Sequence, residues 1–160
     1  MNDLSMLLAI IGAYLWVVIA IVVLIVIIPY LLNAFAVKGF AKAAGYDKPA
    51  LAFVPFGSIQ AMVFQQAANG ISGDGPSSKA SGIVGYGMLI CFILSFVPVI
   101  GMFMTIPVII MGIVAFIFNI LSVSDVCRYT GRGAFLPIFC MIFVPIFGFM
   151  ITCNILKNSL

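Results

Sequence analysis

The chain has 160 residues, of which 65% are hydrophobic and only 7% charged, with a mean hydropathy of +1.35. Soluble domains carry about 25% charged residues, so the composition excludes an ordinary water-soluble domain and predicts one integral membrane domain over residues 1–160. The net charge of +3 is too small and too scattered for nucleic-acid binding, and we expect no nucleic-acid partner.

The first predicted span covers residues 7–32, an uncharged run long enough to cross a bilayer. Because this run exceeds a hydrocarbon core of about 30 Å, the helix must tilt or project at one end. Tyr14 and Trp16 suit the outer interface. The N-terminus carries Asp3 and no basic residue, unlike a secretory signal peptide, so we expect the span to stay in the mature protein.

Basic residues follow this span closely, whereas only Asp3 precedes it. By the positive-inside rule, the segment after the span is cytoplasmic and the N-terminus lies outside, which predicts a multi-pass protein of the cell membrane. A second basic collar follows residue 123. The candidate topology or lipid-headgroup residues are Lys38, Lys42, Lys48, Arg128 and Arg132.

Residues 50–68 form a weaker apolar segment, broken by Pro55 and Gly57. The segment contains three glutamines, which are costly against lipid unless they are paired or wet. We predict a re-entrant or interfacial helix, with a further crossing as the alternative, and a loop over residues 69–82. The candidates for a polar path or, as we favour, for hydrogen bonds between helices are Gln60, Gln65, Gln66 and Asn119.

Residues 83–123 are too long for one span, and Pro98 predicts a turn between spans over 83–97 and 105–123. A single kinked helix is the alternative. The last apolar segment, 134–156, either crosses or returns as a hairpin, and we interpret it as a crossing. The predicted fold class is therefore all-α: a polytopic transmembrane bundle of about four spans plus one broken re-entrant or interfacial segment, with both termini outside.

An internal repeat constrains this topology. One set of three residues recurs at a constant offset: Asn33, Lys42 and Gly45 return as Asn119, Arg128 and Gly131. A Phe-Val-Pro break follows each copy, at Pro55 and Pro145, and a third break lies at Pro98. If both basic collars face the cytoplasm, an even number of crossings lies between them. The spans at 83–97 and 105–123 then leave residues 50–68 to dip in and return.

The order of Lys42, Gly45, Pro49 and the break at Pro55 resembles a family of small bacterial membrane proteins of unknown function. Those proteins occur alone or attached to signal-peptidase modules. The family pattern has a tryptophan before the first break and an asparagine after it, and this chain has neither. The resemblance implies a bacterial inner-membrane protein and supplies no catalytic residue.

Reactive side chains are scarce along the whole sequence. There is no histidine, and the four cysteines form no Cys-x-x-Cys pair. These absences exclude a His-ligated haem, a catalytic triad and most zinc sites. We therefore expect no enzyme activity, no cofactor, and no catalytic, cofactor-binding or metal-binding residue.

Two classes of function fit such a chain. The first is a non-catalytic accessory or scaffolding subunit of a larger membrane complex, whose partners are membrane lipids and other membrane-protein subunits. The alternative is a homo-oligomeric channel, pore or carrier for a small neutral solute, because broken helices often line pathways through a membrane.

Overall fold

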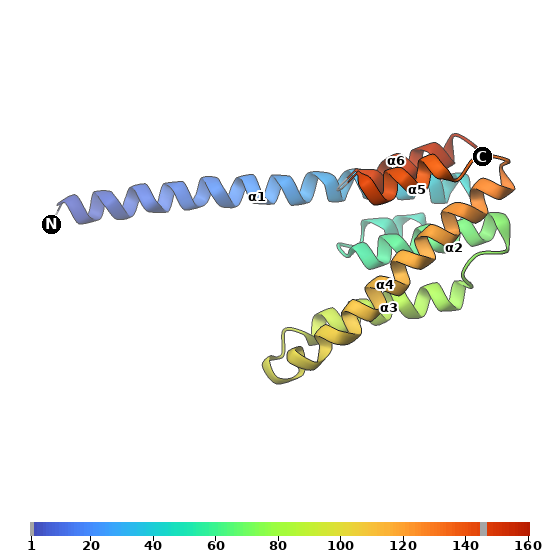
Figure 1. Ribbon diagram of the computed structural model, residues 1–160. Helices are drawn as coiled ribbons and strands as arrows, with labels where there is room; N and C mark the ends of the chain where they lie inside the picture. The colour runs from blue at the N-terminus through green and yellow to red at the C-terminus, as the bar shows by residue number, and fades with distance from the viewer. Residues whose placement is uncertain (1, 145–146) are drawn as a thin grey trace.

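The computed structural model describes residues 2–144 and 147–160, and these form six α-helices and one short 3-10 helix, with no strand among them (Figure 1). The predicted all-α class is confirmed. In chain order the elements are α1 (Asn2–Ala43), η1 (Pro49–Phe53), α2 (Gly57–Ser72), α3 (Ser78–Leu94), α4 (Pro98–Tyr129), α5 (Phe135–Phe143) and α6 (Gly148–Lys157).

Within the described residues, two helices are long and apolar enough to cross a membrane: α1 over Ile10–Ala43 and α4 over Ile100–Tyr129. The structure thus offers two candidate spans where the sequence suggested about four. The predicted first span ended at residue 32, but α1 runs on to Ala43. Basic residues do not interrupt a helical backbone, and α1 ends only near Gly45, which adopts a positive φ of 72°.

Each Phe-Val-Pro sequence lies where one helix ends and another begins. The first separates η1 from α2, and the second separates α3 from α4. Proline lacks the N–H that would continue a helix, so it favours a helix end or start, although Pro29 and Pro107 are accommodated inside α1 and α4. The predicted break near Pro98 is confirmed and the alternative of one kinked helix is wrong, but the turn occupies residues 95–97 and not the predicted 98–104, which belong to α4. α4 extends beyond the predicted limits of 105–123 at both ends, whereas α3 begins before residue 83 but ends at Leu94, short of the predicted 97.

The predicted crossing over residues 134–156 is wrong, because this segment is a hairpin rather than one helix. α5 has 9 residues and α6 has 10, and the two pack against each other (Figure 1). The third break falls between them, although its Pro145 lies outside the described residues. At Gly148 an added Cβ would collide with the Cys140 carbonyl oxygen, so glycine permits this close turn.

The hairpin also corrects the predicted position of the C-terminus, which does not share the N-terminal side of the molecule. A Cβ placed on Gly39 would lie 3.6 Å from Lys157 Nζ, so the end of α6 returns to the basic end of α1. Figure 1 shows the two termini at opposite ends of the molecule.

The predicted loop over residues 69–82 is much shorter in the structure, because α2 continues to Ser72 and α3 already begins at Ser78. Gly73, with a φ of 73°, closes α2. The Ser77 hydroxyl accepts a hydrogen bond from the Ala80 amide at 3.2 Å and caps α3. Local caps therefore hold helical structure in a segment whose composition resembles that of a loop.

The repeated residues have the same local structure in both copies. After α1, the Tyr46 amide donates to the Ala41 carbonyl at 2.9 Å, and after α4 the Arg132 amide donates to the Cys127 carbonyl at 2.8 Å. In each case the intervening glycine has a positive φ, as the Schellman motif requires. Each long helix then packs against the returning helix of the other copy, α1 against α6 and α4 against α2.

The core lies in the half of the molecule that contains the C-terminal part of α1. Phe40 and Phe64 are completely buried, with ring centroids 5.1 Å apart. Val123 of α4 and Leu156 of α6 complete the same cluster. The N-terminal part of α1 is the opposite case: from Ile10 to Ile28 every residue except Gly12 is exposed.

Candidate functional site

The turn at Pro55, between η1 and α2, forms the tip of a first hairpin and lies beside Tyr30 of α1. The Tyr30 hydroxyl donates to the Val54 carbonyl at 2.7 Å, and Gln60 Nε2 donates to the Tyr30 carbonyl at 3.4 Å. The backbone carbonyl freed at the Pro55 break is thus paired within the protein. Such pairing is what a broken helix needs if no water reaches it.

The α5–α6 tip lies at a similar level along α1, and the α3–α4 tip lies further toward the N-terminal end of that helix (Figure 1). Phe147, at the α5–α6 turn, borders a pocket of about 330 Å³ together with Leu24 and Ile28. At the α3–α4 tip, Phe96 packs on Phe92, which in turn contacts Phe56 of the first tip, with centroid distances of 5.4 and 5.6 Å. Figure 1 shows all three tips on the side from which the N-terminal half of α1 extends.

The α3–α4 tip is apolar and makes its polar contacts internally. Phe96 and Phe103 are 75% and 74% exposed. The two nearby hydroxyl groups bond to their own helices, Ser95 to the Cys91 carbonyl at 2.8 Å and Thr105 to the Gly101 carbonyl at 3.3 Å. A tip of this kind is suited to an apolar environment rather than to water.

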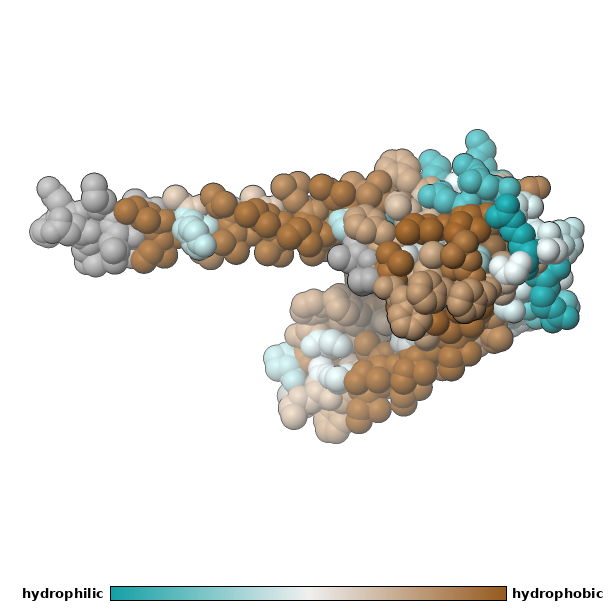
Figure 2. All heavy atoms as spheres, turned by 45° about the horizontal axis from the view of Figure 1, so that its top comes forward, coloured by the Kyte–Doolittle hydropathy of each residue, from teal (hydrophilic) through white to brown (hydrophobic). Residues whose placement is uncertain are grey.

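Polar side chains gather at the opposite end of the molecule (Figure 2). The predicted topology residues Lys38, Lys42, Lys48, Arg128 and Arg132 are all exposed. Lys42 and Arg128 lie in the last turns of α1 and α4, where a cation is favourable to the helix dipole. Lys38 also places its ammonium 5.3 Å from the centre of the Phe53 ring.

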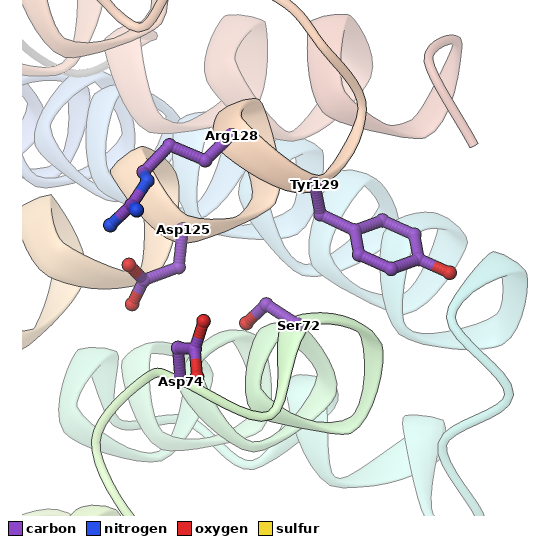
Figure 3. Close-up of a pocket in the computed structure, with 5 residues that line it drawn as sticks. All are labelled: Ser72, Asp74, Asp125, Arg128 and Tyr129. Atoms are coloured by element: carbon purple, nitrogen blue, oxygen red, sulfur yellow. The ribbon is translucent and has the colours of Figure 1, made fainter.

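The same end contains a small polar pocket that sequence reasoning missed (Figure 3). It has a volume of about 230 Å³, and its lining residues come from the end of α2 and the end of α4: Ser72, Asp74, Asp125, Arg128 and Tyr129. Two carboxylates and one guanidinium leave the pocket with one negative charge in excess. No group of three or more potential metal-ligating residues occurs in the described part of the chain.

The predicted amide residues make separate sets of hydrogen bonds. Gln65, only 1% exposed, donates to Asn119 Oδ1 at 2.8 Å and to the Ala115 carbonyl at 3.2 Å, joining α2 to α4. Gln66 accepts from the Tyr46 hydroxyl at 2.5 Å and donates to the Ser78 carbonyl at 3.1 Å. These contacts are hydrogen bonds between segments, the role we favoured for these residues.

Gln60 has a different surrounding. In addition to its bond with Tyr30, it borders a pocket of about 280 Å³ that also touches Asn119, Phe116 and Met141. The structure therefore brings Gln60 and Asn119 to one pocket and leaves Gln66 outside it.

Comparison with family models, with curated proteins and with solved structures found no match to this chain. The resemblance to small bacterial membrane proteins stays a prediction. A functional interpretation therefore depends on the geometry described above.

Proposed function

We propose that the protein is a non-catalytic integral membrane protein that serves as an accessory or scaffolding subunit. In this proposal α1 crosses the cell membrane once, with the N-terminus outside, and the three hairpins enter and leave on the cytoplasmic side. The distribution of side chains supports this placement, because exposed basic residues lie at one end and apolar hairpin tips at the other.

The length of α1 gives a register for the crossing. Trp16 and Lys38 are separated by a rise of about 33 Å, close to the thickness of a hydrocarbon core. In that register Trp16 lies at the outer interface and Lys38 at the inner one. Tyr30, which holds the first hairpin tip, then lies about 12 Å from the inner interface, near the bilayer midplane.

The five exposed basic residues would face anionic headgroups on the cytoplasmic side. Each basic residue near such a surface contributes roughly 1 kcal/mol of attraction. Membrane lipids are therefore the first partner that we propose.

The observation that carries the accessory role is the uncovered half of α1. The first half of α4 packs along α3, whereas none of the most apolar window of α1 is buried in the protein. Ile10 and Ile11 are 63% and 56% exposed and would lie about 8 Å beyond Trp16, past the hydrocarbon. A helix of a second membrane chain, or of a second copy, would cover this surface.

Extraction in mild detergent followed by mass determination tests the accessory role. We expect a stoichiometric complex, with tryptophan substitutions along residues 17–28 weakening it at every third or fourth position, since one helix face would make the contact. The matched control is Ile106→Trp, which alters an exposed apolar position of α4 instead. A lone monomer, or a complex that no substitution along α1 weakens, would contradict the proposal.

The pocket beside Gln60 and Asn119 favours the second candidate, an oligomeric pathway for a small neutral solute. Reconstituted liposomes would then show solute flux that Gln60→Leu abolishes and Gln66→Leu preserves, because Gln66 does not border that pocket. If wild-type protein carries none of a panel of neutral solutes, this candidate is set aside.

A further inference from the structure

We infer that the protein acts as a wedge in one leaflet and that its preferred lipid surface is convex on the basic side. The inference rests on the proposed single crossing by α1. It concerns how the hairpins fill the membrane, and it does not depend on whether a partner covers α1.

The number of helices differs sharply between the two halves of the membrane. At the level of Phe40, α1 is packed into a body that includes α2, α4 and α6, with α3 and α5 against these helices. At the level of Val18, α1 has no neighbour among the described residues. Two of the three hairpins end near Tyr30, the first at Val54 and the α5–α6 hairpin beside Ile28, whereas the α3–α4 tip lies further toward the N-terminal end of α1 (Figure 1).

The packing shows that the difference in helix number between the two halves of the membrane is fixed. Phe40, Phe64 and Val123 are completely buried, so the body cannot become narrower without opening its core. Three helices, α2, α5 and α6, end near the level of Tyr30, and at about 10 Å diameter each they add on the order of 240 Å² to one leaflet alone. The α3–α4 hairpin reaches further along the N-terminal half of α1 and is not counted in this excess (Figure 1).

The outer surface of the body shows that lipid must make room for it. Ile83 of α3, Ile113 of α4 and Phe135 of α5 are 70%, 57% and 80% exposed. These apolar side chains suit acyl chains, and in the proposed register the first tip, bonded to Tyr30, stops within the hydrocarbon. Displacing lipid in one leaflet alone expands that leaflet, which bends a bilayer toward it.

The test uses the full chain reconstituted in giant vesicles from which narrow membrane tubes are pulled. The substitution Leu160→Cys places a thiol on the exposed C-terminal residue at the basic end. A membrane-impermeant maleimide dye added outside labels molecules whose basic end faces outward. Dye trapped inside labels those with the inverted orientation, and the wild-type chain without the added thiol is the labelling blank.

For molecules with the basic end outward, we expect the ratio of tube to vesicle density to exceed one and to rise as the tube narrows. For inverted molecules we expect a ratio below one, so the same chain provides its own matched control. A ratio of one in both orientations would overturn the wedge while leaving the membrane embedding intact. Protein that fails to enter the vesicles at all would instead contradict the proposed function.

Discussion

The two long helices, α1 and α4, share a C-terminal end structure and differ in what accompanies their first halves. Each carries a basic residue in its last turn and closes at a glycine with positive φ. The first half of α4 is accompanied by α3 from the same chain, whereas the first half of α1 is exposed from Ile10 to Ile28 apart from Gly12. In one copy of the repeat the first half of the long helix thus has a neighbouring helix, and in the other it is left uncovered by the described residues.

Glycine positions show how closely other helices approach α3 and how far they stay from the first half of α1. A Cβ on Gly87 of α3 would lie 3.1 Å from Met111 of α4, and a Cβ on Gly85 would lie 2.8 Å from the Cβ of Met62 in α2. Small residues therefore allow helices to approach where the chain packs against itself. Gly12 of α1 has nothing within 4 Å of the corresponding position.

The largest effect that we expect is a difference in stability between side-chain truncations in the two halves of α1. Phe40→Ala empties a fully buried site beside Phe64 and should cost about 3–5 kcal/mol of unfolding free energy. Ile21→Ala removes a side chain that is 51% exposed and should change the stability of the isolated protein by less than about 0.5 kcal/mol. Denaturation in detergent measures both, and equal losses would show that the exposed half belongs to the folded core.

A glycine pair sharpens the same comparison. Gly148→Ala places a methyl group against the Cys140 carbonyl and should destabilise the protein by about 1–3 kcal/mol, because backbone at a tight turn cannot move aside cheaply. Gly12→Ala meets open space within a helix and should stabilise it by up to about 1 kcal/mol. Thermal unfolding in detergent compares the two variants, and stabilisation by Gly148→Ala would contradict the hairpin geometry.

The third effect concerns the amide bridge between α2 and α4. Gln65→Leu leaves Asn119 without its donor and should cost about 1–2 kcal/mol. Adding Asn119→Leu should recover part of this loss, since no unpaired amide would then stay at the contact. A double-mutant cycle with no coupling between the two positions would show that the bridge does not join the helices.

The smallest effect is a pH dependence at Tyr46, on the loop beyond α1. Burial raises the pKa of Tyr46, and the nearby Tyr86 and Asp47 raise it further. The folded state thus favours the neutral phenol. The contribution of Tyr46 to the free energy of unfolding is therefore complete below the unfolded pKa of about 10 and is lost as the pH rises through the higher folded pKa.

The matched variant for this effect is Tyr46→Phe, which cannot titrate and lacks the hydrogen bond to Gln66. Wild type should be more stable than the variant at about pH 8, and the difference should shrink above about pH 10. A difference that stays constant over this range would contradict the raised pKa.

The sequence sufficed to predict the elements that depend on local chemistry. Pro98 indicated a helix break because proline lacks the backbone N–H, and Lys42 with Gly45 indicated a helix end because glycine readily adopts a positive φ. Both effects act on adjacent residues of the chain. For the loop over 69–82 the same kind of reasoning failed. There Gly73 caps the end of α2 and Ser77 caps the start of α3, so both helices extend into a segment of polar composition.

Features set by distant contacts could not be predicted in this way. A proline and a glycine in the segment 134–156 fit a kinked crossing as well as a hairpin, and only the packing of α6 on α1 decides between them. The partners of Gln65 lie on another helix, so the sequence could nominate Gln65 and Asn119 without joining them. The pocket at Asp74 and Asp125 likewise arises from two helix ends that meet in space.

The proposed topology depends most on which membrane face each hairpin reaches, and cysteine labelling in intact cells measures this directly. The single substitutions Lys42→Cys and Arg132→Cys place thiols at the basic end, and Phe96→Cys places one at the α3–α4 tip. With an impermeant maleimide, we predict that the first two react only from the cytoplasmic face and that Phe96→Cys reacts from neither face. Reaction of Phe96→Cys from the outside, or of the two basic positions from opposite faces, would contradict the account.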